Sequence, residues 1–100
     1  MKVSKIKSKV YNLVKKIPKG KVSTYKIVSL KTGLNPRLIG RILSQNSNLN
    51  EIPCFRVVCS NGFIGGYVKG IKEKKRKLKI EGVKIKNFKI VDFKEKIFNF

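Results

Sequence analysis

One cysteine in this chain is a candidate nucleophile. Cys54 follows a proline, lies among apolar residues and comes two positions before Arg56. Only the thiolate form of cysteine reacts, and an unperturbed thiol with a pKa of about 8.5 is a few per cent ionised at neutral pH. Nearby cations increase that fraction; a buried structural cysteine is the alternative interpretation. Cys59 has no preceding proline and no cation within two residues, so we expect it to be structural.

Histidine is absent from the chain, and this excludes several kinds of site at once. Neither a histidine general base nor a histidine metal ligand is available. The two cysteines are five positions apart, which is not a zinc-binding spacing, and two ligands do not complete a zinc site. We therefore expect no metal and no cofactor. Two cysteines also make no disulfide framework, which favours a reducing, cytoplasmic compartment.

The charge balance predicts the class of partner. Lys and Arg number 25 and Asp and Glu number 5, giving a net charge of +20, and the first fifty residues carry twelve cations and no acid. A polyanion is the natural partner of such a chain, with nucleic acid as the first candidate. A lysine-rich solvated surface is the alternative. No apolar run approaches the roughly 20 residues that span a bilayer, and no signal-peptide core follows the N-terminus, so we expect no membrane partner.

The first half of the sequence predicts three helices. One hundred residues support a single domain spanning 1–100. Apolar residues at helical spacing predict a helix over 3–17, ended by Pro18 and Gly20. A second helix over 25–32 has Ser23 or Thr24 as its N-cap, and a third over 36–46 begins after Asn35. The helices over 25–32 and 36–46 predict a helix-turn-helix.

The second half predicts smaller elements around the cysteine. Residues 46–51 form a polar loop, 52–58 have strand character with a proline breaker, and 60–62 form a turn. A basic helix over 71–81, a hairpin around Asn87 and a short helix after Asp92 follow. The fold class that we expect is α/β, mainly helical: a winged-helix-like DNA-binding domain with a helix-turn-helix and a small C-terminal hairpin.

The sequence around Cys54 resembles a known active-site motif. Residues 52–58, Ile-Pro-Cys-Phe-Arg-Val-Val, are similar to the motif of the O6-alkylguanine-DNA alkyltransferases, whose usual form is Pro-Cys-His-Arg-Val. Other segments resemble the family in order and spacing: residues 17–25 with its tyrosine, 35–41 at its recognition helix, Asn46 at its hinge asparagine, 60–62, 65–67 and Gly70 at its pocket wall, and 74–78 followed by 80–82 at its closing helix. The resemblance runs from about residue 8 to the C-terminus.

The resemblance implies a stoichiometric DNA-repair reaction, that of a methylated-DNA–[protein]-cysteine S-methyltransferase. The helix-turn-helix would bind double-stranded DNA through the minor groove, and an O6-alkylguanine would flip out of the stack into a pocket. Cys54 would then take the alkyl group irreversibly, so that each molecule acts once. Tyr25 would crowd the phosphate beside the flipped base and donate a proton to the leaving guanine. Arg37 would fill the gap left in the duplex; a phosphate contact is its alternative role.

The resemblance also assigns the remaining site residues. The catalytic residues are Cys54, Tyr25 and Glu81. The DNA contacts come from Tyr25, Thr24, Arg37, Gly40 and Arg41. The substrate pocket comprises Asn46, Pro53, Arg56, Val57, Gly65, Gly66 and Tyr67. We expect a monomer that lacks the N-terminal domain typical of the family.

One departure from the family motif concerns the activation of the thiol. Phe55 stands where the family has a histidine that links a glutamate to the cysteine through a water. Glu81 matches that glutamate by position; without the histidine it is free to pair with a Lys or Arg. Either the local field suffices and transfer is slower, or the chain recognises alkylguanine without repairing it. A basic helix-turn-helix protein with a structural cysteine is the third hypothesis.

Overall fold

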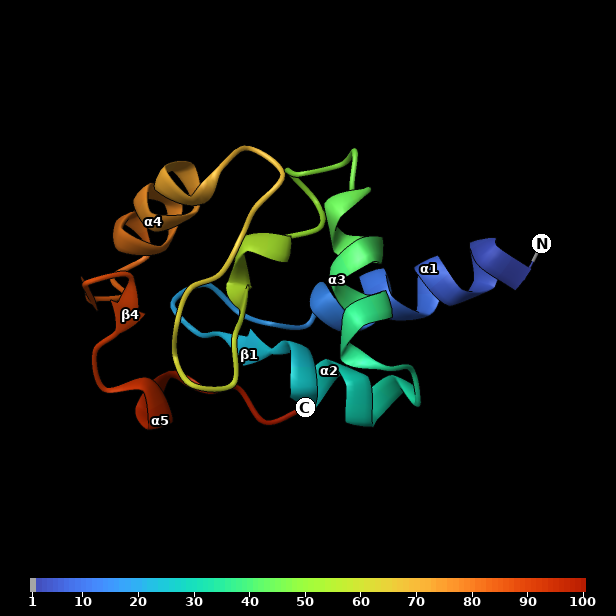
Figure 1. Ribbon diagram of the computed structural model, residues 1–100, viewed down its shortest axis with the longest axis horizontal. Coiled ribbons are helices and arrows are strands. Elements are labelled where there is room, and N and C mark those ends of the chain that lie inside the picture. Colours follow the sequence, from blue (N-terminus) through green and yellow to red (C-terminus); the bar gives the residue numbers. More distant parts are fainter. Residues whose placement is uncertain (1) are drawn as a thin grey trace.

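The computed structural model describes residues 2–100, with side chains from residue 5 onward. Helices α1 (Lys2–Val14), α2 (Tyr25–Thr32) and α3 (Pro36–Ser44) lie on one side of the molecule. Helix α4 (Ile71–Ile80), the hairpin of β3 (Ile85–Lys86) and β4 (Lys89–Ile90), and helix α5 (Phe93–Lys96) lie on the other side (Figure 1). A short central sheet joins the two sides. No helix in the described part of the chain is long and apolar enough to cross a bilayer.

Helices α2 and α3 form the expected helix-turn-helix, and local caps explain its boundaries. The hydroxyl of Thr24 accepts a hydrogen bond from the Ile27 amide at 3.0 Å, which caps α2. Gly33 ends that helix with φ at 76°, a conformation that glycine adopts without strain. The side chain of Asn35 then accepts a hydrogen bond from the Leu38 amide at 2.8 Å, and Pro36 occupies the first turn of α3.

Two helices are shorter than the periodicity predicts. The helix expected over 3–17 ends at Val14, because the amides of Lys16 and Ile17 bond to carbonyls three residues back and tighten the chain into a turn. Ile17 remains fully buried. The helix expected over 36–46 ends at Ser44, and the next two amides make the same three-residue bonds. Apolar spacing continues through such turns, so it does not mark the last helical residue.

The central sheet consists of two short parallel strands. Strand β1 (Ser23–Thr24) pairs with β2 (Val57–Val58) in the register Ser23 to Val57 and Thr24 to Val58. The C-terminal segment extends the sheet, because Ile97 pairs with Val22 on the outer side of β1. The middle of the strand expected over 52–58 is instead a 3₁₀ turn, η1 (Cys54–Arg56), and only Val57–Val58 are strand. Pro53 has no amide hydrogen for a ladder, and its carbonyl accepts the Arg56 amide at 3.0 Å.

The other expected C-terminal elements are present with small changes. The basic helix ends at Ile80, one residue early, and the hairpin turns at Asn87 and Phe88, both with positive φ. Asp92 precedes α5 but makes no side-chain cap bond.

The core consists of two buried clusters, one on each side of the molecule. The first lies beneath the helix-turn-helix and contains Val10, Val14, Ile17, Val28, Ile39, Ile42, Leu43, Ile52, Cys54 and Val57. The second lies beneath α4 and the hairpin and contains Val22, Phe55, Val58, Ile64, Leu78, Val83 and Ile90. Because Cys54 and Phe55 are consecutive in a tight turn, they face different clusters.

The cap of α3 provides a test of how the start of this helix is fixed. We expect Asn35→Ala to lower the free energy of unfolding by about 1 kcal/mol, because one amide of the first turn loses its acceptor. Urea denaturation followed by circular dichroism measures this change. Asn99→Ala, an exposed position, is the matched control and should leave the midpoint unchanged. An equal effect of both substitutions would contradict the assignment of the cap.

Candidate active site and DNA-facing helix

A cavity of about 240 Å³ lies between the helix-turn-helix and the loop that precedes α4. Its walls come from α2, α3, the 3₁₀ turn and the loop, and are formed by Tyr25, Gly40, Leu43, Ser44, Cys54, Gly66, Tyr67 and Val68. Cys54 is a free thiol with 5% of its surface exposed. The cavity thus brings the candidate nucleophile, the candidate proton donor and the recognition helix together.

The loop before Cys54 is held by Asn46. This side chain is buried, donates to the Ile52 carbonyl at 2.9 Å and accepts from the Asn48 amide at 2.9 Å. Two bonds from one amide group therefore close the turn between α3 and the 3₁₀ turn. Asn46 is not part of the cavity wall; it fixes the path of the chain that carries Cys54.

Phe55 packs on the α4 side of the molecule. Its ring meets the Tyr67 ring edge-on, with centroids 6.4 Å apart. The Arg56 guanidinium carbon and the Lys77 ammonium lie 5.2 and 5.4 Å from the Phe55 centroid. A phenyl ring carries no proton that it could relay. The Phe55 position therefore contributes packing and a π face near cations rather than acid–base chemistry.

Glu81 forms a largely buried ion pair with Arg56. The Arg56 Nε donates to the two Glu81 carboxylate oxygens at 3.0 and 3.2 Å, and its Nη2 donates to Oε2. The Gly20 amide also donates to Glu81, at 3.2 Å, and Arg56 Nη1 donates to the Ile17 carbonyl at 2.9 Å. The side chains are 8% and 16% exposed. Glu81 therefore pairs with a cation, as expected for this residue when the histidine is missing, and the pair ties the end of α4 to the segment after α1.

Lys74 is a fully buried lysine beside the cavity. Its Nζ donates to the Val57 carbonyl at 2.7 Å and to the Gly66 carbonyl at 3.0 Å. Burial lowers the pKa of Lys74 to about 8, against the opposing effect of the Cys59 and Cys54 thiols. The sequence alone did not predict a site role for Lys74. Its spacing in the sequence could have indicated its burial. Lys74 lies three residues after Ile71 and four before Leu78, on the same face of α4 as these two apolar residues.

Tyr25 is half-buried at the first position of α2 and lines the cavity. Burial, with smaller contributions from Cys59 and Cys54, raises the pKa of Tyr25 to about 12. The phenol therefore keeps its proton at neutral pH and remains a hydrogen-bond donor.

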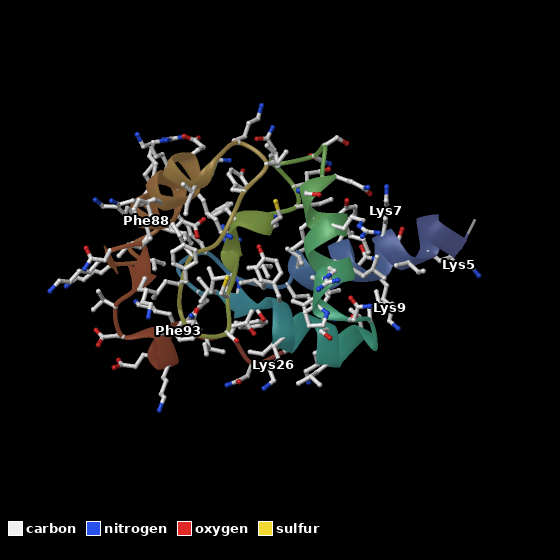
Figure 2. All side chains as sticks on the ribbon, viewed as in Figure 1. Lys5, Lys7, Lys9, Lys26, Phe88 and Phe93 are labelled. Carbon is white, nitrogen blue, oxygen red and sulfur yellow. The ribbon has the colours of Figure 1, made fainter. Side chains whose placement is uncertain are left out.

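Several cations of the first half lie on the helix-turn-helix and on α1. Arg37 and Arg41 are exposed on α3. Lys26 projects outward at the start of α2, and Lys5, Lys7 and Lys9 extend from α1 (Figure 2). Gly40 lies between the two arginines in the sequence and borders the cavity. Thr24 is buried and its hydroxyl caps α2, so the structure gives it a role in helix placement.

The structure divides the seven expected pocket residues into two groups. Gly66 and Tyr67 line the cavity. Asn46, Pro53, Arg56, Val57 and Gly65 are not among the residues that line it, and Pro53 and Arg56 line a separate hollow with Phe55, Lys77 and Glu81. Gly65 has a φ of 76°, and a Cβ there would lie 3.2 Å from the Cys59 sulfur, so a side chain would be strained and crowded. Leu43, Ser44 and Val68 also line the cavity and were not predicted to do so. Tertiary packing decides which face of a helix or loop borders a cavity, and the sequence alone does not show that face.

The arrangement of a helix-turn-helix over a cavity that contains a cysteine defines a DNA-binding domain of the alkyltransferase type. The sequence profile described as the DNA-binding domain of 6-O-methylguanine DNA methyltransferase matches residues 5–83. The chain belongs to this family.

Comparisons with individual proteins agree with this assignment. A methylated-DNA–protein-cysteine methyltransferase of Saccharolobus solfataricus is 51% identical over 76 residues, covering 76% of this chain and 50% of that protein. The chain thus spans about half the length of this curated relative. The O6-methylguanine-DNA methyltransferase of Pyrococcus kodakaraensis superposes with a TM-score of 0.72 at 40% identity, over 77% of this chain and 46% of that one. S. pombe Atl1, in complex with damaged DNA containing O6-carboxymethylguanine, superposes with a TM-score of 0.83 at 27% identity, over 96% of each chain.

The buried Arg56–Glu81 pair predicts a large effect of one substitution. We expect Glu81→Gln to lower the free energy of unfolding by about 3 kcal/mol, because it leaves the Arg56 charge buried without a counter-ion. Glu73→Gln, which breaks the exposed pair with Arg76, is the matched control and should have little effect. Urea titrations of the three proteins test this. Equal midpoints for Glu81→Gln and the native chain would show that the pair is dispensable.

The buried Lys74 predicts a pH dependence of stability. Between its native pKa of about 8 and its ordinary value of 10.5, the unfolded chain binds this proton more tightly than the folded chain. The contribution of Lys74 to the free energy of unfolding therefore rises with pH between about 8 and 10.5, and it is constant at lower pH. We expect Lys74→Met to remove this rise, so that the difference in unfolding free energy between variant and native chain changes by about 3 kcal/mol across the interval. A pH-independent difference would contradict the assignment.

Proposed function

We propose that this chain repairs DNA directly, by moving the alkyl group of an O6-alkylguanine to Cys54. The observation that carries the proposal is the cavity in which Cys54, Tyr25 and helix α3 meet. Membership of the family and likeness to relatives named as methylated-DNA–protein-cysteine methyltransferases support it. Residues 1–100 would act as one DNA-binding and catalytic unit.

The DNA would lie against α3 and the surrounding cations. A net charge of +20 favours binding to the phosphate backbone, with a steep decrease in affinity as salt increases. A paired and stacked guanine hides its O6 substituent, so the base must leave the stack to reach a thiol in a cavity. Arg37 stands exposed at the start of α3, where it would fill the gap in the duplex. Arg41 would contact the backbone one turn later, with Gly40 between them facing the cavity.

The chemistry is a single displacement at carbon. The Cys54 thiolate attacks the alkyl carbon, a sulfur–carbon bond forms and the carbon–O6 bond breaks, with its electron pair leaving on the guanine. The departing guanine takes up a proton, and the neutral phenol of Tyr25 in the same cavity is the donor that we propose. The resulting thioether has no good leaving group, so one chain transfers one alkyl group.

The base would find further partners in the cavity wall. The hydroxyl of Tyr67 is buried and makes no hydrogen bond among the described residues. Such a group is costly unless a partner satisfies it, and the edge of a guanine offers both donors and acceptors. Gly66, beside it, leaves room for the substituent, because no atom lies within 4 Å of its missing Cβ.

The Cys54 thiol is the feature that distinguishes alkyl transfer from recognition of the alkylguanine alone. A lesion-recognition protein without transfer would leave Cys54 unmodified, and a general basic DNA-binding protein would not prefer alkylated over plain duplex. The free Cys54 thiol at the cavity wall supports the proposal of transfer. The absence of the histidine relay affects the rate, since loss of a general base costs typically 10²–10⁴-fold.

Substitution of the two cysteines tests the proposal. We expect Cys54→Ser to abolish loss of the methyl group from a duplex containing O6-methylguanine, because a serine hydroxyl is a far weaker nucleophile than a thiolate. Its preference for lesion over plain duplex should remain. Cys59→Ser is the matched control and should retain transfer. Chromatography of the digested DNA measures demethylation, and fluorescence anisotropy measures binding.

Two results would contradict the proposal. If the native chain binds the lesion duplex preferentially but leaves the methyl group on the guanine, the protein recognises lesions without repairing them. If neither the native chain nor Cys54→Ser prefers the lesion duplex, the cavity is not an alkylguanine site.

A further inference from the structure

Helix α4 carries a row of cations on its outer face. The row has the spacing of three and four residues that places side chains on one side of a helix, and it consists of Lys72, Lys75, Arg76 and Lys79. We call these four residues the α4 stripe. Together with Ile80 they line an open hollow of about 410 Å³. Lys74 and Leu78, which are buried, occupy the inner face of the same helix, so the stripe is directed toward solvent.

The positive charge of the α4 stripe is mostly uncompensated within the protein. Glu73 is the acid within α4, and it pairs with Arg76. The three lysines of the stripe make no salt bridge in the described part of the chain. Like charges three and four residues apart on a helix repel one another and weaken the helix. An anion lying along the stripe would relieve this repulsion.

Two cations of the stripe are held in place before any partner binds. The Arg76 Nε donates to the Glu73 carboxylate at 2.8 Å. The Lys75 Nζ lies 5.0 Å from the centroid of the Phe88 ring, which belongs to the neighbouring hairpin. Side chains that are already ordered lose less conformational freedom on binding, so these two contacts favour a binding role.

The α4 stripe lies away from the helix-turn-helix. Helices α2 and α3 are on one side of the molecule and α4 is on the other, with the loop of the cavity wall between them (Figure 1). Side chains that end in nitrogen extend outward from α4, away from the rest of the protein (Figure 2). A duplex that lies on α3 with one base in the cavity therefore leaves the stripe available to another partner.

We propose that the α4 stripe is a second DNA-binding face, which holds the phosphate backbone of a duplex other than the one on the helix-turn-helix. The stripe extends about 10 Å along the helix axis, and phosphates recur about every 3.4 Å along one strand. Its cations therefore match a short run of phosphates. Contacts of this kind are independent of base sequence. The inference rests on the proposed function in taking DNA as the polyanion.

Two DNA-binding faces would let one chain join two segments of duplex. While the stripe holds one segment, the helix-turn-helix stays at high local concentration near another. The chain could then examine neighbouring DNA for an alkylated guanine without returning to bulk solvent, because contacts with phosphates alone permit sliding and transfer between segments.

The test counts the duplexes bound by one chain. Sedimentation velocity is measured with an excess of plain duplex of about 12 base pairs, little more than one helical turn. We expect a complex of one native chain with two duplexes. The variant Lys72→Gln/Lys75→Gln/Lys79→Gln should bind the second duplex about tenfold more weakly and the first within about twofold of the native affinity.

The matched control removes the same charge from exposed positions outside the stripe. The variant Lys16→Gln/Lys19→Gln/Lys94→Gln should retain the second duplex. Circular dichroism establishes that each variant is folded. An equal loss of the second duplex in both variants would overturn the proposal, because net charge would then explain the effect.

Four other results would overturn the proposal. The first is a complex of one chain with one duplex only. The second is a complex of two chains with two duplexes, because association of the protein would then explain the second duplex. The third is an equal loss of both duplexes in the stripe variant, which would place the stripe on the same DNA as α3. The fourth is a second site that accepts an RNA hairpin but no duplex.

Protection of lysines in the native chain keeps the proposal testable if the stripe variant does not fold. Lysines are acetylated with N-hydroxysuccinimidyl acetate and located by peptide mapping. We expect the first equivalent of duplex to protect Lys26 on α2 and the second to protect Lys72 and Lys79. Protection of all three by the first equivalent, or no protection of the stripe by the second, would overturn the proposal. Plain duplex is used throughout, so failure of methyl transfer would contradict the proposed function alone.

Discussion

The parallel pairing of β1 with β2 is the contact on which the site depends. It is only two residues long on each strand, yet it joins the helix-turn-helix to the C-terminal half. Tyr25 follows β1 directly, and the 3₁₀ turn that carries Cys54 ends where β2 begins. A change in register would move both side chains relative to each other, because each is fixed by the strand next to it. The two buried clusters on either side hold this short ladder in place.

The distribution of charge follows from the same architecture. Most of the cations are on the surface, where water and salt screen them and where a polyanion can reach them. Two of the buried or nearly buried ones, Arg56 and Lys74, both contact the chain close to Cys54. Arg56 is neutralised by Glu81 and acts as a tie between segments. Lys74 is buried beside the cavity, where it donates to the backbone carbonyls of Val57 and Gly66.

Local chemistry predicted much of the fold. Thr24, Gly33, Asn35 and Pro36 set the helix-turn-helix, and each acts through a cap or turn that is visible in the sequence. The 3₁₀ turn at Cys54 was not predicted, because apolar residues on both sides of Pro53 have the same composition as a strand. The partner of Glu81 could not be chosen among 25 cations without three-dimensional contacts. Lys74 was not predicted to be buried. The inner face of a helix is inferred from its apolar residues, and a lysine on that face does not fit the pattern.

The most direct test of the account is the mass of the intact native protein after incubation with an excess of duplex containing O6-methylguanine, followed by peptide mapping. The account predicts a gain of one methyl group per chain, located on Cys54, with no further gain while methylated DNA remains. An unmodified chain that still binds the lesion duplex, or a methyl group found on Cys59 instead of Cys54, would contradict it.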